Sequence, residues 1–195
     1  MVQQIQHLEK PVPEPIGLWQ DGWYRHATRL DSPNFGLRPN GACVDLVVIH
    51  SISLPPGQYG GNEVQALFTN QLDWEAHPYF SQIRGLEVSA HFYIRRDGTL
   101  WQFVSIDHRA WHAGQSEYRG RSQCNDDSIG IELEGLEGEL FEAAMRQRMR
   151  AGRNAGLCAQ FPRPAQQAGD LGTGHAFMAQ HAKHLPEHEV VAIAL

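Results

Sequence analysis

Histidine is unusually frequent in this 195-residue chain, which contains 11 of them. It titrates near neutral pH and is the commonest metal ligand in proteins, so its placement indicates where chemistry can occur. His50 follows the run Leu46–Ile49, which is continuous and rich in β-branched residues, as in a strand buried on both faces. His50 is therefore the first candidate site residue, because strand ends commonly position functional groups.

Glu132 is the second candidate, and it lies in the alternating segment SIGIELEG. Ile131 and Leu133 are expected on one face of a strand, with Glu132 and Glu134 on the other. A hydrolytic zinc site needs three protein ligands, an open position for water and a general base such as glutamate. From the residues alone, a hydrogen-bonded structural histidine and a solvated glutamate are the favoured interpretations.

Composition limits the class of protein. Hydrophobic residues make up 42% and charged residues 19% of the chain, as in one globular domain. A net charge of -6 argues against nucleic-acid binding as the main task. No apolar run approaches the ~18 residues of a membrane span, and the N-terminus has no secretory pattern. The three cysteines are too few and scattered for a disulfide framework. We therefore expect a cytoplasmic monomer without nucleic-acid or membrane partners.

Local patterns predict the elements that must position these residues. Apolar residues at helical spacing predict a helix within residues 62–84, ended by Pro78. Asp97-Gly98 between two alternating runs predicts a hairpin, and residues 107–127 predict a long polar loop. Together they indicate an α/β (α+β) fold, with a central mixed β-sheet flanked by helices.

Several sequence blocks, in order, resemble one known family: LVVIHSISLPPGQYGG, AHPYF, VSAHFYIRRDG, RAWHAG and CNDDSIGIELEG. Between about Gly22 and Gly135 the chain resembles the AmpD-type zinc amidases, the 1,6-anhydro-N-acetylmuramoyl-L-alanine amidases of bacterial cell-wall recycling. The resemblance implies an amidase/peptidoglycan-recognition-like fold and one catalytic Zn²⁺. It also implies a muropeptide substrate, cleaved at the amide between the lactyl group of anhydro-muramic acid and L-alanine.

The resemblance also assigns roles to single residues. The family's first zinc ligand falls on His50, and its catalytic glutamate falls on Glu132. Thr173-Gly174-His175 resembles the block that carries the second histidine ligand, so His175 is implied as a metal ligand. Lys183 lies eight residues further on, at the position of the lysine that stabilises the oxyanion.

The blocks RAWHAG and CND add further expectations. Trp111 and His112 match a family block near the substrate cleft and are implied as substrate-binding residues, with a core role for Trp111 equally open. His91 is interpreted as a packing or cleft residue rather than a ligand. Cys124 is expected to be a buried thiol, and Asn125 to organise its loop through side-chain-to-backbone hydrogen bonds.

The C-terminal part departs from the family pattern. Leu185 occupies the position of the family's aspartate ligand, and no aspartate follows Asp170. Residues 143–165 contain five arginines and no acidic residue, with little apolar periodicity. We therefore expect an extended tail at 1–16, an amidase core at 17–142 and an atypical, poorly ordered segment at 143–195, which resembles an out-of-frame reading. Alternative third ligands in that segment are His181, His184, Glu187 and His188.

Three functions are consistent with the sequence. The first is an active zinc amidase with the family's specificity, and the second is a catalytically impaired relative that still binds muropeptide. The third is a metal-binding or interaction protein built around the histidine-rich end, which leaves the N-terminal blocks unexplained. The third metal ligand distinguishes the first two.

Overall fold

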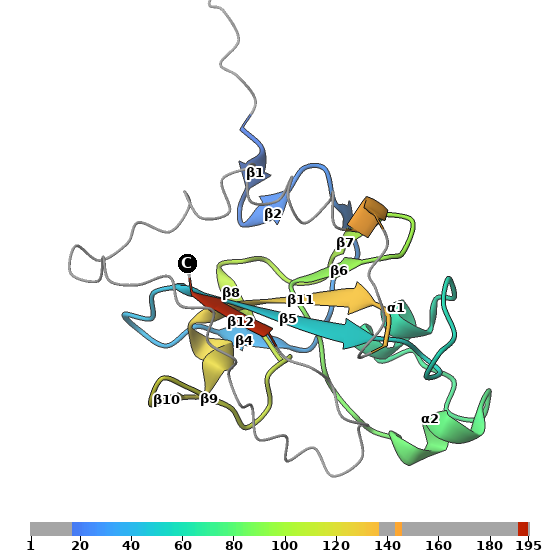
Figure 1. Ribbon diagram of the computed structural model, residues 1–195. Coiled ribbons are helices and arrows are strands. Elements are labelled where there is room, and N and C mark those ends of the chain that lie inside the picture. Colours follow the sequence, from blue (N-terminus) through green and yellow to red (C-terminus); the bar gives the residue numbers. More distant parts are fainter. Residues whose placement is uncertain (1–16, 137–142, 146–190, 195) are drawn as a thin grey trace, which may run out of the picture.

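The computed structural model describes residues 17–136 and 143–145 and the backbone of 191–194. Its centre is a six-stranded sheet in the order β12-β5-β11-β6-β7-β3 (Figure 1). The strands are β3 (Thr28–Arg29), β5 (Leu46–Ile52), β6 (Phe92–Ile94), β7 (Leu100–Gln102), β11 (Ser128–Glu134) and β12 (Val191–Ala194). β5, β11 and β6 run parallel, whereas β7 is antiparallel to β6 and β12 is antiparallel to β5. The predicted mixed sheet is confirmed.

The two central strands bury both faces, as their apolar runs predict. On β11, Ile129 and Leu133 are fully buried in a cluster that also contains Phe92 of β6. A second cluster lies around α1 (Glu63–Phe68) and includes Phe68 and Phe103. Because side chains alternate along a strand, Glu132 lies on the face opposite Leu133. That face is also covered here, so the alternative of a solvated glutamate is wrong.

The helical segment differs from its prediction, because two short helices replace one. α1 ends at Phe68, and Asn70 then adopts the left-handed conformation with φ of 58°. Pro78 begins α2 (Pro78–Gln82) instead of ending a helix. Proline suits the first helical position, where no intrahelical partner is needed for its missing N–H, and His77 caps the helix by accepting from the Tyr79 N–H at 3.1 Å.

The predicted hairpin is confirmed between β6 and β7. Gly98 has a φ of 85°, a conformation that favours glycine, and its N–H donates to the Arg95 carbonyl at 2.9 Å. The Asp97 carboxylate accepts from the Thr99 N–H at 2.8 Å. Asp97 and Gly98 therefore form the turn by the chemistry expected of this pair.

The segment 107–127 contains more structure than a long loop. It holds β8 (His108–Ala110), β9 (Glu117–Tyr118), β10 (Arg121–Ser122) and a 3-10 helix at Cys124–Asp126. β8 pairs with β4 (Phe35–Leu37), and β9 pairs with β10. The remaining pair is β1 (Trp19–Gln20) with β2 (Trp23–Tyr24). Short strands of this kind leave little periodic signal, which explains the incomplete prediction.

Two pieces of the C-terminal segment belong to the described fold. Met145 is fully buried in the same cluster as Leu133. β12 pairs with β5 and forms an edge of the sheet. The expected tail at 1–16 and most of the segment 143–195 lie outside the described residues, so the predicted division of the chain stays a prediction. Within the described ranges, no helix is long and apolar enough to cross a membrane.

Candidate functional site

His50 and Glu132 are register partners on neighbouring parallel strands. Opposed residues of paired strands project to the same face, so their side chains share one side of the sheet. Tyr93 of β6 is the register partner of Glu132 on its other side. His50, Glu132 and Tyr93 therefore form a row across three neighbouring strands. His50 is 6% and Glu132 8% exposed. The predicted proximity of His50 and Glu132 is therefore confirmed.

The Glu132 carboxylate is buried with incomplete hydrogen bonding. Among the described residues, no hydrogen-bond partner contacts its Oε2 atom. Desolvation by burial raises the pKa of Glu132 to about 8. A buried, orphaned carboxylate oxygen is costly unless a cation or a polar ligand completes it. The position next to His50 therefore fits a site that holds a metal ion or a polar substrate.

His112 lies in the loop after β8 and contacts His50, the first residue of this row. Its Nδ1 lies 3.0 Å from His50 Nε2, and its Nε2 lies 3.1 Å from Ser128 Oγ. The ring packs against Gly130, where a Cβ atom would stand 2.7 Å from Nδ1. Burial, followed by the neighbouring His50, lowers the pKa of His112 well below its usual 6.5. The ring is therefore neutral at pH 7, and both its nitrogens contact protein atoms.

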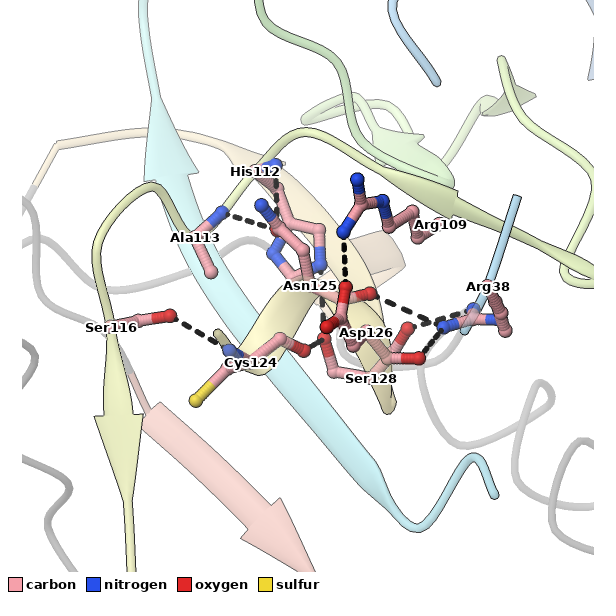
Figure 2. A network of polar contacts seen from close by, with 9 residues as sticks. All are labelled: Arg38, Arg109, His112, Ala113, Ser116, Cys124, Asn125, Asp126 and Ser128. Atoms are coloured by element: carbon pink, nitrogen blue, oxygen red, sulfur yellow. Dashed lines mark hydrogen bonds and ion pairs between the residues drawn. The ribbon is translucent and has the colours of Figure 1, made fainter. Parts of the chain in front are cut away.

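Asn125 holds the backbone that carries His112. Figure 2 shows its Oδ1 accepting from the N–H groups of His112 and Ala113, at 3.1 and 2.9 Å. The role expected for Asn125 from the sequence is confirmed. Cys124 is a buried thiol, as expected, and its N–H donates to Ser116 Oγ at 3.0 Å. The 3-10 helix thus fixes the position of the His112 loop.

Arg38 holds the backbone around the 3-10 helix in place through hydrogen bonds. The sequence did not predict this role. Its guanidinium donates to backbone carbonyls of four residues: Ile106, Asn125, Asp126 and Ser128. Arg109 adds an ion pair to the Asp126 carboxylate (Figure 2). Burial lowers the pKa of Arg38 to about 10, so it remains a cation at neutral pH. Its Nη2 also lies 3.2 Å from His91 Nε2. No sequence pattern points to a residue that donates mainly to backbone carbonyls.

His91 supports the sheet from within the core. Its Nδ1 accepts from the Gly130 N–H at 3.0 Å, so in the neutral ring Nε2 carries the proton and donates to the His108 carbonyl at 3.0 Å. Burial, and then the positive charge of Arg38, lowers the pKa of His91 to about 3. The interpretation of His91 as a packing residue is consistent with these contacts.

Glu134 anchors two loops at the end of β11. Its carboxylate oxygens accept from the Gly60 N–H at 2.6 Å and from the Arg96 N–H at 2.9 Å. Burial, and then the nearby negative charge of Glu134, raises the pKa of Tyr93. Glu134 was expected only to share a face with Glu132. The structure shows that it fixes the loop after β5 beside the row of His50 and Glu132.

The remaining predicted site residues are less completely placed. Trp111 is partly buried, and its backbone N–H donates to Ser89 Oγ at 3.0 Å. His175 and Lys183 lie outside the described residues. Within the described ranges, no group of three or more His, Cys, Asp or Glu residues can hold a metal ion. The donor chemistry nevertheless suits zinc, because His50 supplies an imidazole next to an uncompensated carboxylate.

Comparison with known proteins agrees with this fold. The sequence matches the family described as N-acetylmuramoyl-L-alanine amidase over residues 40–188, which extends into the C-terminal segment. It is 47% identical over 169 residues to the 1,6-anhydro-N-acetylmuramyl-L-alanine amidase AmpD of Citrobacter freundii, covering 87% of this chain and 88% of that one. AmpD of Escherichia coli (strain K12) is 46% identical, covering 87% of this chain and 90% of its own. A crystal structure of a selenomethionine derivative of AmpD superposes with a TM-score of 0.71, at 50% identity over 73% of this chain and 79% of that one. This chain therefore belongs to the N-acetylmuramoyl-L-alanine amidase family, whose members hydrolyse an amide bond.

Proposed function

We propose that this protein is a zinc-dependent amidase that hydrolyses the lactyl–L-alanine amide of 1,6-anhydro-N-acetylmuramoyl peptides in cell-wall recycling. The observation that carries the proposal is the pairing of His50 with Glu132 on one face of the central strands. The relatives from Citrobacter freundii and Escherichia coli bear the name of this activity and match along most of their length.

His50 and His175 would hold the zinc ion in this site. When bound, zinc polarises the amide carbonyl and lowers the pKa of a water molecule to about 7. Beside a bound cation the raised pKa of Glu132 would fall, so the ionised carboxylate would accept a proton from the attacking water and pass it to the leaving amine of L-alanine. Its near-complete burial keeps bulk water away from that proton. Lys183 would stabilise the oxyanion that develops on the carbonyl.

The substrate would lie against the loop that follows β8. Trp111 would offer an aromatic surface to the muropeptide. His112 would contribute through the position of its loop, since both its ring nitrogens contact protein atoms. We infer that residues 17–142 form the amidase core and that the protein acts in the cytoplasm as a monomer, without a membrane or nucleic-acid partner.

The test is hydrolysis of purified 1,6-anhydro-N-acetylmuramoyl tripeptide by the full chain after reconstitution with zinc. Mass spectrometry should detect anhydro-N-acetylmuramic acid and a peptide with a free N-terminal alanine. A protein that retains stoichiometric zinc and native circular dichroism but releases no peptide would contradict the proposed activity.

A second function is favoured by one feature of the sequence, which is Leu185 at the position of the family's aspartate ligand. Without that carboxylate, two histidines leave the zinc charge uncompensated, and the protein would bind muropeptide without cleaving it. Titration calorimetry with the intact substrate separates the two functions. Tight binding without hydrolysis, together with a gain in zinc affinity in Leu185→Asp, would favour the impaired relative.

A further inference from the structure

A chain of hydrogen bonds leads from the 3-10 helix to His50, and its direction can be determined. Ser128 Oγ donates to the Cys124 carbonyl, which can only accept. Ser128 Oγ also lies 3.1 Å from His112 Nε2. A serine hydroxyl has one proton, and here it is already used, so His112 Nε2 must be the donor in this second contact.

The same reasoning extends to His50. A neutral imidazole has one donor and one acceptor nitrogen, so His112 Nδ1 is the acceptor when Nε2 carries the proton. His50 Nε2 lies 3.0 Å from that acceptor and must therefore donate to it. The proton of a neutral His50 is then on Nε2, and Nδ1 is the nitrogen that carries the lone pair.

We propose that His112 is a positioning residue that holds His50 in the tautomer with its proton on Nε2, so that Nδ1 is the atom that binds the metal. This inference rests on the proposed role of His50 as a zinc ligand. A ligand histidine commonly donates its other N–H to a protein acceptor, which fixes the ring and raises its basicity. In this chain the acceptor is a second imidazole.

The surroundings of His112 are built to hold this ring in place. Gly130 leaves the space into which the ring packs. Asn125 accepts from the His112 backbone N–H and from the following N–H, so the main chain is fixed as well as the side chain (Figure 2). Arg38 in turn donates to the Asn125 carbonyl at 3.3 Å. Both the ring and the backbone of His112 are thus held in place before any metal binds.

The first test examines the ¹⁵N-labelled, metal-free full chain by NMR. Long-range ¹⁵N–¹H correlations should show one tautomer for both rings, with the proton on Nε2, assigned with single-histidine variants. A ¹⁵N–¹⁵N coupling between His50 Nε2 and His112 Nδ1 should report the hydrogen bond directly. A His50 ring with its proton on Nδ1, or a mixture of tautomers, would overturn the proposal even if the protein is an active amidase.

The second test measures zinc affinity by competition with a chelating dye. His112→Ala should weaken zinc binding about 10- to 100-fold, as loss of an outer-shell partner typically does. His112→Asn keeps an acceptor near the Nδ1 position and should restore most of the affinity. His26→Ala, at an exposed histidine, is the matched control and should bind as the parent protein does.

The variants also distinguish the proposal from direct ligation by His112. If His112 bound the ion itself, His112→Asn would bind as weakly as His112→Ala, and zinc addition would abolish the ¹⁵N–¹⁵N coupling between His50 Nε2 and His112 Nδ1. Either result would overturn the proposal. If the parent protein bound no zinc, the proposed amidase function would fail, while the metal-free NMR measurement would still decide the tautomer of His50.

Discussion

The imidazole ring of His112 lies against the α-carbon of Gly130, in the space where any other residue would carry its side chain. A Cβ atom at position 130 would stand 2.7 Å from His112 Nδ1, well inside van der Waals contact. Gly130 is therefore required for close packing and not for an unusual backbone conformation. The glycine of β11 and the histidine of the loop form a single structural unit next to His50.

Gly130→Ala should displace the His112 ring and weaken zinc binding, because the added methyl group removes the space that the ring occupies. Overpacking of this kind typically costs about 1–3 kcal/mol of stability. Chemical denaturation and dye competition measure the two effects. Gly17→Ala is the control, since the nearest heavy atom to its new Cβ would be 3.6 Å away. Unchanged zinc affinity in Gly130→Ala would show that the ring position does not matter.

Glu132→Gln should lower kcat at least ~10²-fold while leaving the zinc content unchanged. The amide keeps the shape of the side chain but cannot accept a proton from water. Steady-state hydrolysis of the anhydro-muropeptide and metal analysis provide the two readouts. The exposed Glu117 supplies the control Glu117→Gln, which should behave as the parent protein. Activity at the parent level in Glu132→Gln would remove Glu132 from the proposed role.

His91 should make the folded state less stable as the pH falls below about 6.5. Its pKa is about 3 in the folded protein, and the charges and rings that face it are those of Arg38, His108 and His112. Between pH 6.5 and 3 the unfolded chain binds a proton at this residue and the folded protein does not. This group alone therefore removes up to about 1.4 kcal/mol of stability per pH unit.

Denaturant unfolding at several pH values tests this dependence. The loss of stability between pH 6.5 and 4 should be less steep in His91→Gln, which cannot titrate, than in the parent protein. His26→Gln changes an exposed histidine and should keep the parental slope. Identical slopes in His91→Gln and the parent protein would show that His91 is not held neutral by the fold.

Arg38→Lys should destabilise the protein although the charge is conserved. Lysine cannot reproduce the planar fork that donates to the carbonyls of Ile106, Asn125, Asp126 and Ser128. Leaving buried carbonyls without donors costs about 1–3 kcal/mol each, so a loss of several kcal/mol is expected in thermal or chemical unfolding. Arg84→Lys, at an exposed ion pair with Glu75, should change stability by less than about 1 kcal/mol.

The sequence predicts the central strands and the hairpin because their signals are local. Leu46–Ile49 forms a continuous apolar run, and β11 alternates apolar and polar residues, so both strands and their inward faces follow from the pattern. The position of Glu132 opposite Leu133 follows in the same way. Its partnership with His50 depends on strand register, which local patterns do not contain and the structure shows.

Other parts of the site could not be predicted because their contacts are long-range and involve the backbone. Arg38 lies in a segment rich in turn-forming residues, and its acceptors are main-chain carbonyls that leave no pattern in side-chain types. Glu134 looks like any alternating strand residue until Gly60 and Arg96 are seen to donate to it. The break between α1 and α2 arises from local turn geometry at Asn70, where apolar spacing alone suggests one continuous helix.

The order of strands has a consequence for synthesis of the protein. In the described sheet, both neighbours of β5 follow it in the chain, since β11 and β12 are made later. While the ribosome translates the intervening residues, the apolar strand that carries His50 has two unpaired edges. Unpaired apolar edges promote pairing between chains. A nascent chain that ends before β11 would therefore expose both edges of β5 to pairing with other chains until its C-terminal half emerges.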